Sequence, residues 1–143
     1  MKLIGFNYTK ILAQRKPLIT GNPRIATGIE FISIDEEKIE LLKEQKALRI
    51  TFKLEILYQT GEEKKPEEQA KVSFEGSLLL AATPEEYKEV MKSWKKKELP
   101  GTMRITVFNI ILAKCSVKAL DLEEQLNLPL YPSLPQLVPQ EKN

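Results

Sequence analysis

The chain has 143 residues, of which 42% are apolar and 29% are charged, and this is ordinary for one folded domain with a single hydrophobic core. Its 22 basic and 20 acidic residues give a net charge of +2, which does not favour a nucleic-acid binder with a basic face. Histidine is absent, so the commonest general base and metal ligand is missing. We therefore expect a protein that is not an enzyme and that uses no metal or cofactor.

The compartment is inferred from the cysteine content and from the apolar runs. Cys115 is the single cysteine, so no intrachain disulfide can form, and a reducing, cytoplasmic setting is indicated. The opening MKLIGFNYTK is too short and too polar for the apolar region of a signal peptide. No stretch approaches the ~20 apolar residues of a membrane span. We expect a cytoplasmic protein that does not insert into membranes.

The first predicted element is a strand over residues 2–13. Phe6 and Tyr8 lie in phase on one face, whereas Leu3 and Ile11 fall on the other. A strand that is apolar on both faces is either central or covered by a neighbouring subunit. A second strand is predicted over residues 24–34. The charged segment 35–46 has a helical composition without a consistent apolar stripe, and we interpret it as a connection with at most two helical turns.

Two further strands are predicted over residues 47–59 and 71–81. In the first of them, apolar and polar residues alternate more regularly than elsewhere in the chain, which predicts one buried face and one solvent-exposed face. Gly76 interrupts the second and indicates a bulge or a close approach of another backbone. The intervening QTGEEKKPEEQ, residues 59–69, is predicted to be an exposed hairpin loop.

Helices are predicted near residues 84–97 and 103–118. Thr83 is the expected N-cap of the first helix, with Pro84 at the first helical position and Glu86 completing a capping box. The second helix is apolar around most of its circumference, so it must be covered on more than one side. Its main apolar stripe is expected to consist of Ile105, Phe108, Leu112 and Cys115. The apolar residues expected outside that stripe are Val107, Ile110 and Val117. Asp121 and Glu124 are expected to cap a separate final turn.

The order of these elements predicts the fold class. Four strands followed by helices, without β–α–β alternation, indicate an α+β domain with a four-stranded antiparallel sheet and two helices packed on one face. We expect this domain to cover residues 1–129. The closing segment 130–143 is rich in proline and leucine, and we expect it to pack in an extended form along apolar surface of its own or a neighbouring subunit. The alternative is a disordered tail.

Four segments in order resemble the SecB-like export chaperones: GFNYTKILAQRKP, ALRITFKLEILYQTGEE, KVSFEGSLLLA and MRITVFNIILAKCSVKALDLEEQLNLP. The resemblance covers most of the chain. It implies a long crossover between the first two strands, and dimers that pair through the first strand and first helix and associate into tetramers. It also implies that unfolded polypeptide binds in an apolar groove between the crossover and the second helix.

The resemblance implies site residues on this chain. Those for polypeptide binding are Leu18, Ile19, Ile25, Val107 and Ile111. Those for the subunit interface are Leu3, Ile11, Tyr87, Met91 and Trp94. The expected partners are therefore unfolded polypeptide or a dedicated protein partner, together with further copies of the chain in a homodimer or homotetramer.

The chain departs from the family in its charge. SecB proteins are typically acidic, and their acidic sheet docks the translocation motor, whereas Arg49, Thr51, Lys53 and Glu55 here form a mixed face. A chaperone that acts in protein export is thus only one of two interpretations of the sequence. The alternative is a dedicated adaptor of the same fold, such as a chaperone that guards an antitoxin, without general holdase activity. Suppression of the aggregation of an unrelated unfolded protein discriminates the two.

Overall fold

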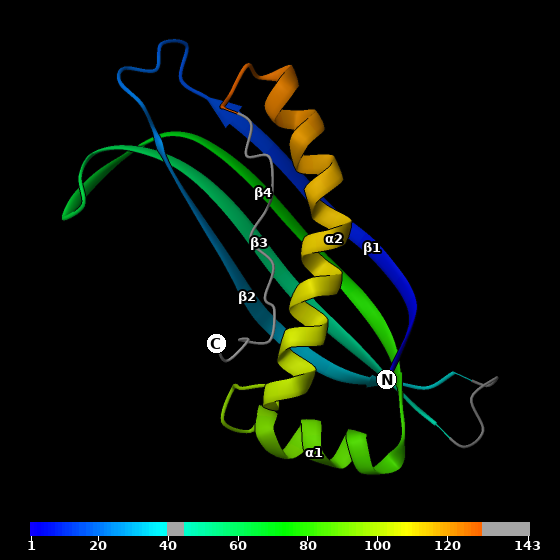
Figure 1. Ribbon diagram of the computed structural model, residues 1–143. Helices are drawn as coiled ribbons and strands as arrows, with labels where there is room; N and C mark the ends of the chain where they lie inside the picture. The colour runs from blue at the N-terminus through cyan, green and yellow to red at the C-terminus, as the bar shows by residue number, and fades with distance from the viewer. Residues whose placement is uncertain (40–44, 130–143) are drawn as a thin grey trace, which may run out of the picture. The chain divides into compact units, whose positions relative to one another are not determined.

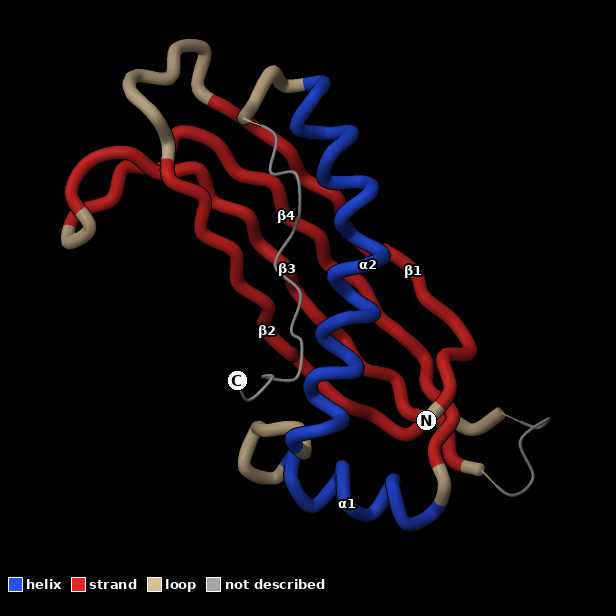
Figure 2. Tube along the Cα trace, in the orientation of Figure 1, coloured by secondary structure: helices blue, strands red, loops and turns tan. Residues whose placement is uncertain are grey.

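The computed structural model of the protein describes residues 1–39 and 45–129. Its elements are β1 (Lys2–Arg15), β2 (Arg24–Glu37), β3 (Lys46–Glu62), β4 (Lys65–Ala82), α1 (Pro84–Trp94) and α2 (Gly101–Gln125). The four strands form one sheet in the order β1-β4-β3-β2 and precede both helices (Figures 1 and 2). The predicted α+β class, an antiparallel sheet of four strands followed by two helices, is confirmed. The expectations for the tail, residues 130–143, lie outside the described residues.

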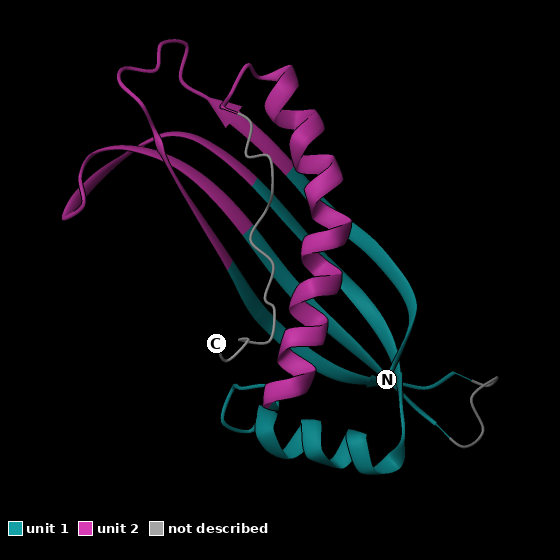
Figure 3. Cartoon of the chain, in the orientation of Figure 1, with its two compact units in different colours: residues 1–11, 29–54, 73–100 teal, residues 12–28, 55–72, 101–143 magenta. Residues whose placement is uncertain are grey.

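The chain divides into two compact units, and every strand contributes to both (Figure 3). Unit 1 comprises Met1–Ile11, Ile29–Leu54 and Ser73–Pro100, and so includes α1. Unit 2 comprises Leu12–Gly28, Glu55–Val72 and Gly101–Asn143, and so includes α2. The prediction of a single domain over residues 1–129 stays a prediction.

The alternation predicted for β3 is confirmed. Its inward side chains are at most 1% exposed, and they are Leu48, Ile50, Phe52, Leu54, Ile56 and Tyr58. Within unit 1 the aromatic rings of β1 add to this core. The Phe6 ring lies 5.6 Å from that of Phe52, and the Tyr8 ring lies 5.6 Å from that of Phe74. Burial of each such side chain stabilises the fold by about 1.5–3 kcal/mol, which fixes the register of the strands.

A chain of polar side chains in unit 1 links all four strands. Arg49 on β3 binds Glu37 on β2 through two guanidinium nitrogens and donates a third hydrogen bond to the Ser77 hydroxyl on β4 at 3.0 Å. Ser77 in turn donates to Asn7 Oδ1 on β1 at 3.0 Å. The Arg49 guanidinium lowers the pKa of Glu37, mainly through these hydrogen bonds. The mixed charges predicted for β3 thus include a paired arginine.

β2 is longer than the predicted residues 24–34. It continues to Glu37, so the first part of the expected connection 35–46 is strand and not helix. The reason is cross-strand pairing, because Lys46 at the start of β3 binds Glu36 at 3.0 Å and Arg49 binds Glu37. Such pairs stabilise neighbouring strands. Residues 40–44 of this connection lie outside the described part of the chain.

The expected hairpin loop, residues 59–69, is mostly strand. β3 runs to Glu62 and β4 begins at Lys65, which leaves a tight turn between them. Gly61 adopts φ +87°, a left-handed value that suits glycine just before the turn. The prediction of exposure is confirmed for residues 61–68 and was wrong for Gln69, whose side chain is buried. The charged composition therefore predicted that this segment is exposed to solvent, but it did not predict that the segment forms paired strands.

α1 begins as predicted and ends earlier. The Thr83 hydroxyl accepts from the Glu86 backbone N–H, and Glu86 Oε1 accepts from the Thr83 N–H, so the capping box is confirmed. The helix ends at Trp94 rather than at residue 97. Lys97 has φ +60°, so the lysine run follows the helix instead of forming its last turn.

α2 is longer than predicted and absorbs the expected final turn. Nothing in Thr102–Gln125 breaks a helix, because this stretch contains neither proline nor glycine. Asp121 is therefore an interior residue that accepts from Gln125 at 3.1 Å, and not a cap. The helix ends at Gln125. Asn127, just after it, has φ +51°, and the Leu128 N–H donates to the Glu123 carbonyl at 2.9 Å, which completes a Schellman motif.

Candidate functional site

The crossover between β1 and β2, residues 16–23, is held at both ends within unit 2. At its start, Arg15 donates to the carbonyls of Leu126 and Asn127 at 2.8 and 3.0 Å, which also places a cation at the C-terminal end of α2. At its end, Arg24 donates to the Gly61 carbonyl at 2.6 Å. The crossover therefore lies at the end of unit 2 where α2 finishes (Figure 1).

Three of the residues predicted to bind polypeptide lie in or next to this crossover. Leu18 is 75% exposed. Ile19 and Ile25 are half-buried. A leucine so open to water, on a segment tied down at both ends, presents apolar surface without the entropy loss of ordering a free loop.

The other two predicted binding residues, Val107 and Ile111, lie in the core. Both are fully buried on a stripe of α2 that repeats every four residues. The stripe consists of Met103, Val107, Ile111, Cys115, Ala119 and Glu123. A role of Val107 and Ile111 in polypeptide binding stays a prediction, and in this structure their side chains are enclosed. The structure does not bring them to a surface shared with Leu18.

The predicted apolar stripe of α2 was wrong for two of its members. Ile105 and Phe108 are half-exposed, whereas Val107, which was placed outside the stripe, is buried. Four of the large apolar side chains of α2 that are not fully buried lie outside the stripe. At about 3.6 residues per turn, Phe108 and Ile110 fall on its two sides, and Ile105 and Val117 fall on the face of the helix opposite to it. We call these four residues the apolar flanks of α2.

The apolar flanks of α2 are open to solvent to different degrees. Val117 is 74% exposed and the other three are half-exposed. The Arg104 guanidinium lies 5.7 Å from the centre of the Phe108 ring, which places a cation next to this surface. The sequence indicated these flanks, because it places more apolar residues on α2 than a single buried stripe can include.

Beneath the C-terminal half of α2, a buried polar pair fixes the helix to β3. The Tyr58 hydroxyl donates to Glu123 Oε2, and both side chains are fully buried. Burial of the phenol, reinforced by the hydrogen bond to the Glu123 carboxylate, raises the pKa of Tyr58 well above its usual range. The sequence analysis missed Glu123, because a glutamate near a helix end is normally solvated.

The five predicted interface residues all belong to unit 1. Ile11 is 42% exposed on β1, and Leu3 is half-buried there. Tyr87, Met91 and Trp94 are half-exposed on α1, whose only fully buried described residue is Val90. Their role in an interface stays a prediction.

Two of these aromatic residues are held by charged neighbours in unit 1. Tyr87 donates to Glu36 Oε2 at 3.0 Å, and the Lys46 ammonium lies 5.4 Å from its ring centre. The Lys97 ammonium lies 5.0 Å from the Trp94 ring centre. The hydrogen bond to Glu36 raises the pKa of Tyr87. Tyr87 and Trp94 are thus oriented without being fully buried.

Within residues 1–39 and 45–129, the structure contains no group of three or more histidine, cysteine or acidic side chains able to hold a metal ion. In the same part of the chain, no helix is long and apolar enough to cross a membrane.

No protein-family model matches this chain, and no curated protein matches it. Among solved structures, the chain is similar to the Mycobacterium tuberculosis SecB-like chaperone Rv1957, which was determined in complex with a ChAD peptide from the Rv1956 HigA1 antitoxin. The two chains are 18% identical, the match covers 98% of this chain and 92% of that chain, and the TM-score is 0.48.

Proposed function

We propose that the protein binds extended or unfolded polypeptide, as a chaperone does, on Leu18 and the apolar flanks of α2. The observation that carries the proposal is the exposure of apolar side chains on both sides of the buried stripe of α2 and on the anchored crossover. Exposed apolar surface of this kind is characteristic of interaction sites. The sequence resemblance to the SecB-like chaperones agrees with this function.

Binding of this kind requires no nucleotide, metal or catalytic group. An apolar side chain of the client that leaves water on this surface contributes on the order of 1–3 kcal/mol, so about five such contacts are needed for micromolar binding once the entropic cost of association is included. The contacts are not directional, which suits clients of varied sequence. We favour a general holdase over a dedicated adaptor, because the exposed side chains of Leu18 and Val117 offer little shape selectivity. We place this activity in the cytoplasm, because the lone Cys115 suits a reducing compartment.

The proposal predicts stoichiometric suppression of the aggregation of an unrelated unfolded protein, measured by light scattering during dilution from denaturant. Leu18→Asp and Val117→Asp should each weaken client affinity by about tenfold, because each removes an apolar contact and adds a charge that must be desolvated. Thr20→Asp is the matched control, since it adds the same charge at an exposed crossover position without removing apolar surface.

Two outcomes would contradict this prediction. Aggregation unaffected by the wild-type chain would favour the dedicated adaptor. Equal losses in Thr20→Asp and Leu18→Asp would mean that charge, and not apolar contact, governs binding.

We also propose that copies of the chain associate through unit 1, using Leu3 and Ile11 on β1 and Tyr87, Met91 and Trp94 on α1. The support is that these side chains are apolar or aromatic and partly exposed. Light scattering at micromolar concentration should then give two or four times the chain mass of 16.4 kDa. Particles of 16.4 kDa would contradict the association.

A further inference from the structure

β2 is an edge strand of the sheet. It stands last in the strand order β1-β4-β3-β2, so within the described residues one of its edges has no neighbouring strand. The part of β2 in unit 1 begins at Ile29. In an antiparallel edge strand, alternate residues direct their backbone N–H and C=O groups away from the sheet, where only water or an added strand can bind them.

This segment lacks the two residue types that most often protect an edge, lysine and proline. Natural edge strands carry lysine, proline or a bulge that prevents pairing with other chains. Between Ile29 and Ile34 there is no lysine and no proline, and Glu30 is the single charged residue. Ile32 is 45% exposed on this strand. No described strand pairs with this edge, and Ile32 offers an added strand an apolar contact.

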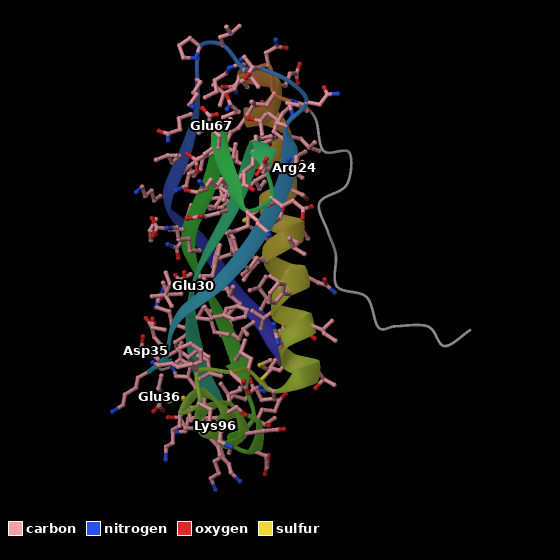
Figure 4. The ribbon with its side chains drawn as sticks, turned by 90° about the vertical axis from the view of Figure 1, so that its left-hand side faces the viewer. Arg24, Glu30, Asp35, Glu36, Glu67 and Lys96 are labelled. Atoms are coloured by element: carbon pink, nitrogen blue, oxygen red, sulfur yellow. The ribbon has the colours of Figure 1, made fainter. Side chains whose placement is uncertain are left out.

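The charges along the segment favour a basic partner. Figure 4 looks on to β2, with Glu30, Asp35 and Glu36 labelled along it. Glu36 is bound by Lys46 and Tyr87. By contrast, none of the ion pairs found among residues 1–39 and 45–129 involves Glu30 or Asp35. These two exposed carboxylates lie on either side of Ile32 in the sequence.

We propose that the edge of β2 from Ile29 to Asp35 is a second polypeptide site, which accepts an extended client segment as an added strand. The segment places an apolar side chain against Ile32 and, on the opposite face of the strand, a lysine or arginine beside Asp35. An extended backbone fits because its N–H and C=O groups repeat at the spacing of those on β2. The inference rests on the proposed polypeptide binding and adds a site that recognises backbone rather than apolar surface alone.

The test uses the full chain and a synthetic peptide of alternating valine and lysine residues. Its control is the same peptide with alternate backbone nitrogens methylated, which removes the donors on one edge and leaves every side chain in place. The unmodified peptide should slow amide hydrogen exchange at alternate residues of 29–35 by at least tenfold at saturation, and the methylated peptide should bind at least tenfold more weakly.

A pair of protein variants tests the same site from the other side. Ile32→Lys should weaken peptide binding about fivefold to tenfold, because it installs an edge lysine and repels the peptide. Ile4→Lys is the matched control, since Ile4 is 46% exposed on β1 in the same unit. Both variants should keep the thermal stability of the wild-type chain to within a few degrees.

Three results would overturn the inference. Unchanged exchange at residues 29–35 by a chain that still suppresses aggregation would remove the β2 site and leave the proposed function standing. Absence of both peptide binding and aggregation suppression would remove both. A particle mass that rises with protein concentration and falls in Ile32→Lys would assign the edge to a second copy of the chain instead of a client.

Discussion

Replacement of Gly76 by alanine should lower the free energy of unfolding by about 3 kcal/mol, the upper part of the range for overpacked sites. A Cβ at this position would lie 2.3 Å from the Asn7 carbonyl oxygen and 3.1 Å from Tyr8 Cα. Both are backbone atoms of β1, so a side-chain rotation cannot relieve the clash. β1 and β4 would have to separate, which breaks part of their hydrogen-bond ladder. Urea denaturation followed by circular dichroism measures the loss.

Gly28→Ala is the matched control for this change. Gly28 also lies in a strand, β2, but a Cβ added there would meet no heavy atom within 4 Å. We expect this variant to be neutral or more stable by about 0.5–1 kcal/mol, because alanine restricts the unfolded chain. Equal destabilisation of the two variants would mean that glycine acts through strand propensity and that the close approach at Gly76 is not the cause.

Tyr58→Phe should lower the free energy of unfolding by about 1–3 kcal/mol, because it takes a hydrogen-bond donor from the buried Glu123 carboxylate. The change removes a single oxygen atom, so the loss is not one of packing. Tyr87→Phe is the control. It removes the same atom from a half-exposed tyrosine whose partner, Glu36, is also bound by Lys46. Its effect should be much smaller.

The Tyr58 pair also predicts a dependence on pH. The pKa of Tyr58 is raised in the folded protein, so the folded state keeps a proton that the unfolded chain loses near pH ~10. The stabilisation is therefore complete below pH ~10 and decreases as the pH rises above it. The stability difference between wild type and Tyr58→Phe should shrink between pH 9 and 11, while the titration of lysines cancels in the comparison. A difference that stays constant over this range would contradict the proposed protonation.

The sequence predicted those parts of the fold that depend on local patterns. The alternation from Leu48 to Tyr58 has one physical solution, because a slip of one residue would bury Arg49 and Lys53. Thr83 and Glu86 form the predicted capping box because both hydrogen bonds are made within a single turn. Gly76 was expected to mark a bulge or a close approach, and the approach of β1 is confirmed.

The missed features depend on partners that are distant in the sequence. The extension of β2 to Glu37 requires Arg49 on the next strand, which no local window contains. The buried role of Glu123 depends on Tyr58, which lies 65 positions earlier in the chain.

In the candidate site, too, some features could be predicted from the sequence and others could not. Leu18 was predicted for polypeptide binding, and it lies open on the crossover. Val107 and Ile111 were predicted with it and are enclosed, because the buried stripe of α2 repeats every four residues and passes through both. A helix that is apolar around its circumference offers several possible stripes, and only the position of the strands beneath it selects one. The apolar flanks of α2 are the stripes that were not selected.

Photo-crosslinking from α2 tests the central claim, that unfolded polypeptide binds the apolar flanks of α2, most directly. A photoreactive phenylalanine derivative placed at Val117 should crosslink to an unfolded client in proportion to its concentration, and an excess of unlabelled unfolded client should abolish the product. The same derivative at Lys88, an exposed position on α1 in unit 1, is the matched control and should give little product. Equal crosslinking from the two positions, or none from Val117 under conditions in which the protein suppresses aggregation, would contradict the claim.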